Sequence, residues 1–160
     1  MYAFATFAII ATVVGAWQTF GQQQMQPIAQ ASSSAQAQAQ ALNMAAYRQS
    51  VISYLQSADP SFIGSIPPGQ LKKIANYASD GLWNNYVEGN TVVVYAQSPT
   101  SASLPSFTAK IAHGSVFAGV ARGGYLVPTG QPGVSIPLPA AIANRIADGT
   151  PVWMAQVTRG

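Results

Sequence analysis

The sequence has no cysteine and very few charged residues. Seven of its 160 residues are Lys or Arg and four are Asp or Glu, so charged residues make up 7% of the chain, where about 25% is usual for a soluble domain. The absence of cysteine excludes disulfides, thiolate nucleophiles, and zinc or iron–sulfur sites held by thiolates. Only two basic residues, Lys72 and Lys73, are adjacent, whereas nucleic-acid binding needs a concentrated basic face. We therefore expect no nucleic-acid partner.

The chain also offers little for catalysis or for metal binding. His113 is the single histidine, and its position before Gly114 predicts an exposed turn residue. The acids are scattered through predicted turns and helix ends, and no phosphate-binding glycine motif or nucleophile elbow is present; these acids are Asp59, Asp80, Glu88 and Asp148. We expect no enzyme activity, no catalytic, cofactor or metal site, and no small-molecule substrate.

A glycan-binding or hydrolytic domain of the cell envelope is the least favoured alternative. It would need a concave acidic or aromatic site, and aromatic residues at strand positions usually belong to the core. The residues that could form such a sugar-stacking face are Trp83, Tyr86, Tyr125 and Trp153.

The first charged side chain is Arg48, and the chain begins with a long apolar run. Between Met1 and Trp17 the only polar side chains are Thr6 and Thr12. Twenty helical residues span about 30 Å, the thickness of the hydrocarbon core of a bilayer. We predict a single transmembrane helix over residues 1–20. Its membrane anchor residues are Tyr2, Phe4, Phe7, Ile9, Ile10, Val13, Val14 and Trp17.

Other interpretations of this run are less well supported. A cleaved signal peptide fits the small residues at 14–16 but lacks the usual Lys or Arg before the apolar stretch. A buried core helix has neighbours too polar to cover it. A type IV pilin start needs a basic leader, or an acid at the fifth mature position, where Ala5 stands. The lack of Lys or Arg directly after Trp17 favours export of the C-terminal part.

Residues 21–41 are rich in Gln, Ala and Ser and have few large side chains. Pro27 and the serines at 32–34 predict interruptions of a helix, although Ala and Gln favour a helix from Ala35 onward. We interpret this segment as a spacer between the anchor and a folded domain over residues 42–160.

The folded domain is predicted to be α+β, with a long N-terminal helix, one or two short helices, and an antiparallel sheet of four or five strands. Apolar residues at helical spacing predict helices over 42–57, 70–79 and 139–148. After the second of these helices the spacing of apolar residues changes to a period of two. The expected strands cover 91–95, the alternating residues around 107–111, a hairpin formed by 115–121 and 124–127, and 152–157.

Several soft motifs resemble those of a known family. They are the helix start Asn43-Met44-x-x-Tyr47-Arg48, then Gly64-Ser65-Ile66-Pro67, Leu82-Trp83-Asn84-Asn85-Tyr86-Val87 with Thr91-Val92-x-Val94-Tyr95, Ile136-Pro137-Leu138-Pro139, and Asp148-Gly149-Thr150-Pro151-Val152. Together with the layout of anchor, spacer and domain, they resemble the PilM family of type IVb and conjugative thin-pilus systems. That family is unrelated to the actin-like protein of the same name in type IVa systems.

The resemblance implies an inner-membrane-anchored periplasmic protein that is needed for pilus biogenesis and has no enzymatic activity. We expect a single-pass protein whose C-terminal domain contacts other proteins of the pilus apparatus by tethering, with the bacterial inner membrane as its second partner. A minor pilin-like subunit of the fibre is the alternative, and homo-oligomerisation is left open.

Overall fold

The structure is a computed structural model that describes residues 31–75 and 81–158. The chain divides into two compact units, residues 1–35 and residues 36–160, and the second unit carries the fold. The predicted anchor at 1–20 lies outside the described residues. Within the described ranges, no helix is both long enough and apolar enough to cross a membrane.

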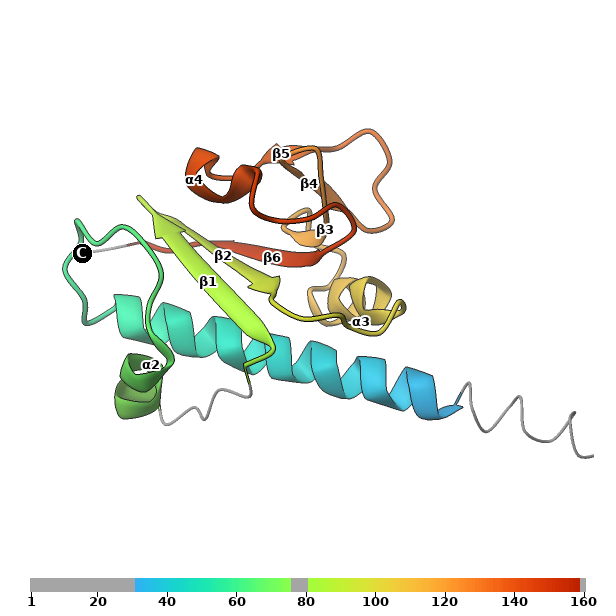
Figure 1. Cartoon of the computed structure of the whole chain (residues 1–160), viewed down its shortest axis with the longest axis horizontal. Helices are drawn as coiled ribbons and strands as arrows, with labels where there is room; N and C mark the ends of the chain where they lie inside the picture. Colours follow the sequence, from blue (N-terminus) through green and yellow to red (C-terminus); the bar gives the residue numbers. More distant parts are fainter. Residues whose placement is uncertain (1–30, 76–80, 159–160) are drawn as a thin grey trace, which may run out of the picture. The chain divides into compact units, whose positions relative to one another are not determined.

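Residues 31–55 form one helix (Figure 1), which we call the long helix. Its buried side chains recur every three or four residues, so they lie on one stripe; they are Ala37, Ala41, Met44, Tyr47, Val51 and Leu55. The helix predicted from Leu42 is therefore confirmed, but its boundary at residue 42 lies inside a longer helix. The predicted interruption at residues 32–34 is wrong. The Ser34 hydroxyl donates to the carbonyl of Ala31 at 3.0 Å, a bond that a helix accommodates.

Three short helices and six strands follow, and they confirm the α+β class. In chain order they are α2 (Pro68–Ala75), β1 (Trp83–Glu88), β2 (Thr91–Ala96), α3 (Leu104–Ile111), β3 (Ala118–Arg122), β4 (Tyr125–Pro128), β5 (Ile136–Pro137), α4 (Ala140–Ala143) and β6 (Pro151–Gln156). The strands form one curled antiparallel sheet in the order β1-β2-β6-β3-β4-β5.

Both faces of the sheet are covered (Figure 1). Val92 and Val94 of β2 pack into a cluster with residues of the long helix and α3, whereas Val93 between them belongs to a second cluster on the opposite face. In that second cluster, Leu138 and Ile142 come from the segment that leads from β5 into α4. Because successive strand residues point to opposite faces, the apolar run in β2 serves both clusters.

The alternation of Phe107, Ala109 and Ile111 predicts a strand, and this prediction is wrong because the segment is helix α3. Phe107 and Ile111 are also four residues apart, which is one helical turn, and a five-residue pattern does not separate the two periods. Leu104 and Thr108 repeat the four-residue spacing and are the buried residues of α3. A proline at its first turn suits a helix start.

The predicted count of four or five strands is too low, because β1 and the two-residue β5 are additional. The stretch that forms β1 contains two asparagines, a residue type that is rare in strands. The hairpin of β3 and β4 and the final strand β6 are confirmed. The last predicted helix is shorter than expected, because α4 covers only Ala140–Ala143. The second predicted helix begins two residues earlier, at Pro68, and its end at Ser79 lies outside the described residues.

Gly119 allows the backbones of β3 and β4 to approach each other closely. A β-carbon at this position would lie 2.0 Å from the carbonyl oxygen of Val127 and 2.7 Å from the α-carbon of Pro128. Both atoms belong to the backbone of the paired strand, so neither can move aside without breaking the pairing. A glycine inside a strand often marks such a close approach.

We expect Gly119→Ala to lower the free energy of unfolding by about 3 kcal/mol, the upper range for an overpacked site. Urea unfolding of the chain in mild detergent, followed by tryptophan fluorescence, measures the change. Gly69→Ala is the matched control, because a β-carbon there has open space and alanine suits helix α2. Equal stability of the two variants would contradict the steric interpretation.

Candidate functional site

The eight predicted anchor residues, from Tyr2 to Trp17, lie outside the described residues, so the structure does not place them. What the structure does bring together is three of the motif segments. They meet where the long helix crosses β1, at a set of residues that we call the helix–strand junction: Asn43, Tyr47, Ile66, Trp83 and Asn85.

Asn85 occupies the centre of the junction and is 2% exposed. Its Oδ1 accepts a hydrogen bond from the backbone N–H of Ile66 at 2.7 Å, and its Nδ2 donates to the carbonyl of Ile66 at 3.0 Å and to the Tyr47 hydroxyl at 2.7 Å. One amide side chain therefore joins the strand, the long helix and the loop before α2.

Trp83 makes the second cross-link of the junction, since its indole Nε1 donates to Oδ1 of Asn43 at 2.7 Å. Asn43 and Tyr47 are one helical turn apart, a rise of about 6 Å. Their partners Trp83 and Asn85 are two strand residues apart, about 6.7 Å. The two spacings are similar, and the residue numbers rise in the same direction along the helix and the strand. Both hydrogen bonds can therefore form together.

The loop before α2 is held against β1 by backbone bonds as well. The N–H of Gly64 donates to the carbonyl of Val87, and the N–H of Val87 donates to the carbonyl of Gly64, each at 2.9 Å. Two residues further, the loop has moved away from the strand, and the Asn85 side chain replaces the backbone contact to Ile66. Burial raises the pKa of the Tyr47 phenol, so this hydroxyl stays neutral where it meets the amide.

Arg48, the first charged residue of the chain, points toward the sheet. Its guanidinium carbon lies 5.0 Å from the ring centroid of Trp153, and its buried Nε has no hydrogen-bond partner among the described residues. Burial lowers the pKa of Arg48, but an arginine stays protonated at neutral pH. The contact is a cation–π interaction, which stabilises by about 0.5–2 kcal/mol.

The motif that begins at Asp148 fixes the β3–β4 hairpin. Oδ1 of Asp148 accepts a hydrogen bond from the N–H of Gly123 at the hairpin turn, at 2.8 Å. The N–H of Gly149 donates to the carbonyl of Ala121, and the N–H of Ala121 donates to the carbonyl of Thr150, both at 2.8 Å. These bonds give the motif a structural role at the entry to β6.

His113 is the exposed turn residue that its sequence position predicts. It follows α3 with φ of 52°, in the left-handed region. Its N–H donates to the carbonyl of Lys110, and the N–H of Gly114 donates to the carbonyl of Ala109. This is the Schellman arrangement that ends many helices, in which His113 takes the position that glycine usually occupies.

The acids whose side chains are described also have separate local roles. Asp59 accepts hydrogen bonds from the N–H and the hydroxyl of Ser61 at 2.8 and 2.7 Å, and these bonds lower the pKa of its carboxyl. Glu88 is exposed at the end of β1. Across the described ranges, no three His, Cys, Asp or Glu residues gather where they could hold a metal ion.

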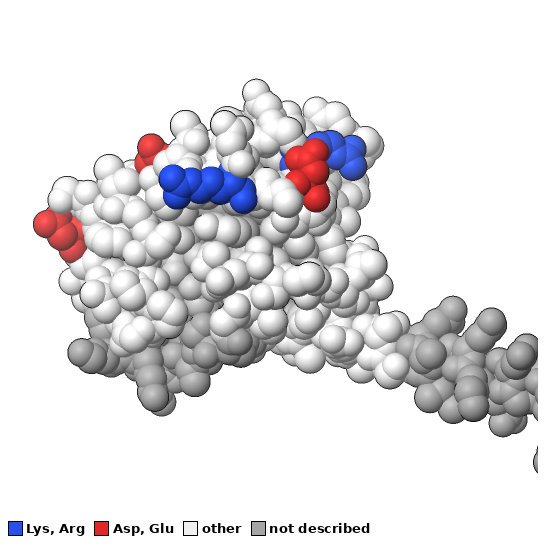
Figure 2. All heavy atoms as spheres, viewed as in Figure 1, with Lys and Arg blue, Asp and Glu red and all other residues white. Residues whose placement is uncertain are grey.

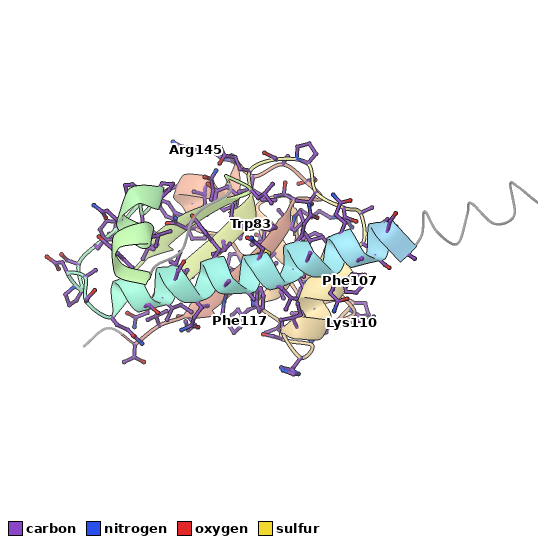
Figure 3. The ribbon with its side chains drawn as sticks, turned by 90° about the horizontal axis from the view of Figure 1, so that it is seen from below. Trp83, Phe107, Lys110, Phe117 and Arg145 are labelled. Atoms are coloured by element: carbon purple, nitrogen blue, oxygen red, sulfur yellow. The ribbon has the colours of Figure 1, made fainter. Side chains whose placement is uncertain are left out.

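The four aromatic residues considered for a sugar-stacking face do not share one face. Trp83 and Trp153 are buried in the cluster under the long helix, whereas Tyr86 packs against the opposite face of the sheet. Figure 3 shows Trp83 close to the long helix. Tyr125 is 48% exposed on β4. The arrangement therefore offers no aromatic platform built from these four rings.

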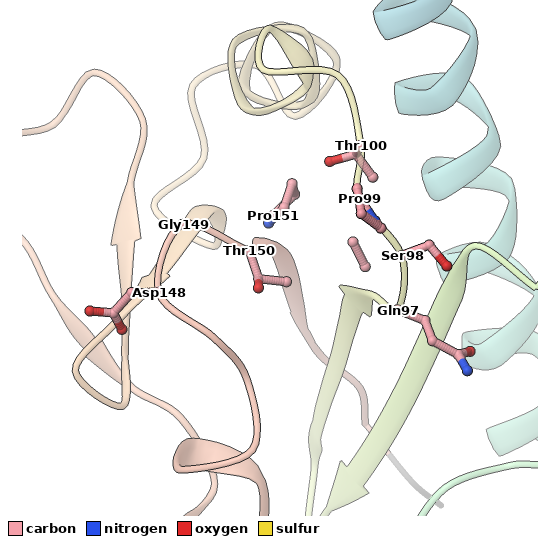
Figure 4. Close-up of a pocket in the computed structure, with 9 residues that line it drawn as sticks. Gln97, Ser98, Pro99, Thr100, Asp148, Gly149, Thr150 and Pro151 are labelled. Atoms are coloured by element: carbon pink, nitrogen blue, oxygen red, sulfur yellow. The ribbon is translucent and has the colours of Figure 1, made fainter.

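The described surface has several depressions, of which three are considered in turn. One, of about 360 Å³, lies between residues 96–100 and 148–151 (Figure 4). Its lining includes Ser98 and Thr100, but the side chains of Ser98 and Asp148 point away from each other. A smaller notch of about 200 Å³ adjoins the helix–strand junction. A third, of about 410 Å³, lies where β5 faces the ends of β2 and β6, and we call it the concave groove.

We expect Asn85→Ala to lower the free energy of unfolding by about 3 kcal/mol. The change leaves the Ile66 N–H and carbonyl and the Tyr47 hydroxyl with fewer partners in a buried place, and unsatisfied buried groups cost about 1–3 kcal/mol each. Urea unfolding measures the loss. Asn84→Ala is the neighbouring control, since Asn84 is half-buried on the other face of β1; an equal loss in both variants would count against the junction.

Replacing His113 should separate a chemical role from a conformational one. His113→Gly relieves the cost of a left-handed non-glycine residue, about 1 kcal/mol, so we expect a higher melting temperature. His113→Ala removes the imidazole and keeps that cost, and it should melt below His113→Gly. Circular dichroism melts of the two variants test this, and the reverse order would refute the conformational account.

Comparison with known proteins agrees with this architecture. A search of curated proteins finds no match. A crystal structure of a protein from Escherichia coli B7A that carries the name PilM is similar to this chain, with a TM-score of 0.55 and 21% sequence identity over 76% of this chain and 93% of that one. At this identity the likeness supports the fold alone.

The family comparison covers more of the sequence. The model of the PilM family matches residues 8–154, which include all the motif segments listed above and the whole helix–strand junction. The chain therefore belongs to the PilM family.

Proposed function

We propose that this protein is an assembly component of a type IVb or conjugative pilus apparatus, held in the inner membrane by residues 1–20 with its folded domain in the periplasm. Membership of the PilM family supports the link to pilus biogenesis. The uncharged apolar run before residue 21 supports the anchor. The folded domain then acts by binding other proteins of the apparatus.

The observation that carries this proposal is the way the long helix joins the domain. Residues 31–41 are helical, and Gln40 accepts a hydrogen bond from the N–H of Ser101 at 3.1 Å. Only ten residues separate position 20 from position 31, and they reach at most about 35 Å. A domain on so short a connection stays near its anchor, which raises its local concentration toward partners in the same membrane.

The scarcity of charge supports a domain that is partly covered in an assembly. Figure 2 shows that most of the visible face is uncharged, with a few basic and acidic side chains. Charged residues are depleted from the centres of protein interfaces. We propose no enzymatic activity, because the described acids serve turns, a hairpin and a strand end, and His113 caps a helix.

A minor pilin-like subunit is the second candidate, and one observation favours it. The long helix is a single element from residue 31 to residue 55, and in the sequence it follows an apolar segment. A subunit of this design could pack into a fibre through that segment. It would then occur in sheared pili, whereas an assembly component that stays in the membrane would be absent from them.

The anchor is tested by fractionation of cells that express the full chain. We expect the protein in the membrane pellet, resistant to extraction with alkaline carbonate, because a spanning helix is not released by charge reversal. A variant that lacks residues 2–20 should move to the soluble fraction. Full extraction of the unaltered chain would refute the anchor, and mass spectrometry that finds Met1 on the purified protein would count against processing as a pilin.

A further inference from the structure

The proposed function assigns no role to the concave groove. It is lined by Glu88, Thr91, Ile136, Pro137, Leu138, Pro139, Met154 and Gln156. Four of these residues form the motif Ile136-Pro137-Leu138-Pro139. The groove encloses about 410 Å³, and all of its lining residues are among those described.

The register of the sheet explains why this end of the concave face is open. Glu88, Thr91 and Gln156 lie side by side on β1, β2 and β6, and the Gln156 amide donates to the Thr91 hydroxyl at 3.0 Å. The next row, which contains Val93 and Met154, is buried by the segment after β5. The segment after β5 does not cover the polar row of Glu88, Thr91 and Gln156. Met154, at the border of the buried row, forms the apolar floor of the groove.

The opposite wall is an unusual strand edge. Pro137 lies opposite Tyr125 in the β4–β5 pair, and the N–H of Leu138 donates to the carbonyl of Gly124 at 3.0 Å. Because antiparallel residues bond to the partner strand alternately, the Pro137 carbonyl points away from β4. Pro137 has no N–H, so this edge presents an acceptor and no donor there.

The groove therefore offers mainly hydrogen-bond acceptors and negative charge. Glu88 is its only charged residue and is exposed, and the outward carbonyl of Pro137 is a second acceptor. Thr91 and Gln156 already bond to each other. A complementary occupant must supply donors and positive charge, together with an apolar side chain for the floor formed by Met154. Extended backbone has N–H groups free to reach a strand edge.

We propose that the concave groove binds an extended segment of another pilus-apparatus protein that places a lysine or arginine against Glu88 and an apolar side chain on Met154. The proposal rests on the proposed function, since it names the chemistry of the partner that an assembly component would hold. The carboxylate of Glu88 calls for a cation on the partner, and electrostatic pairing at such a rim sets specificity and the rate of association.

The test uses the full chain in its own cells. The photo-crosslinking residue p-benzoylphenylalanine is placed at Gln156, which is exposed and lines the groove, and in a control chain at Ser106, which is exposed on α3 outside the groove. We expect a crosslinked product from position 156 and none of the same mass from position 106. Mass spectrometry of the crosslinked peptide should find a lysine or arginine within three residues of the captured position.

Charge variants then test the role of Glu88. Glu88→Lys should reduce the crosslinked product at least tenfold and Glu88→Asp should largely keep it, while matching thermal melts show that both variants fold. Changing the captured partner residue to glutamate should restore the product with Glu88→Lys. The proposal is overturned by a product that Glu88→Lys leaves unchanged, by a captured peptide without a cation, by capture of a second copy or of this chain's own residues, or by no product above the control.

The two proposals fail in different ways. If deletion of the protein leaves pilus formation unchanged, the proposed function fails whatever the crosslink shows. If deletion abolishes pili but Glu88→Lys leaves both pili and the crosslink unchanged, the groove proposal fails and the assembly role stands.

Discussion

The fold depends on the hydrogen bonds of one buried amide. Asn85 joins β1 to the long helix through Tyr47 and to the preceding loop through Ile66. A buried asparagine lowers the stability of a fold unless its side chain is hydrogen-bonded. Here Oδ1 and Nδ2 of Asn85 each have at least one hydrogen-bond partner. The same bonds place the loop at the edge of β1, where Gly64 and Val87 complete a short backbone pairing. The Asn85 amide therefore fixes the long helix, β1 and the loop relative to one another, although the hydrophobic pattern of the sequence does not predict a polar group at this position.

A small number of directional bonds matters more in a chain that has so little charge. Asp59 and Asp148 take part in local turn and hairpin bonds, and the half-buried Arg48 lies over an aromatic ring rather than a carboxylate. Ion pairs on a surface contribute little to stability in any case. The domain therefore relies on apolar packing on both faces of the sheet, and its surface is left largely neutral. A neutral surface suits lasting contact with other proteins better than free diffusion at high concentration.

The sequence predicted the elements whose pattern is long or chemically distinctive. The stripe of the long helix, the β-branched run of β2 and the glycine turn between β3 and β4 each follow from local spacing. The strand predicted at 107–111 was wrong because residues four apart fit both periods over so short a segment. β1 was missed because its two asparagines lower its strand propensity, and the partners that stabilise Asn85 lie 19 and 38 residues away. The motif residues of the helix–strand junction were singled out by resemblance, but their contacts needed the tertiary structure.

At the helix–strand junction, the spacing of residues along the long helix differs slightly from the spacing along β1. Each four-residue step along the helix gains about 6 Å and each pair of strand residues about 6.7 Å, so the two spacings differ by about 0.7 Å. After a second step of the same kind the two spacings differ by about 1.4 Å. The next positions along the helix and the strand are Val51 and Val87, and both are buried in the same apolar cluster. At these positions apolar packing, which has no directional requirement, takes the place of a third hydrogen bond.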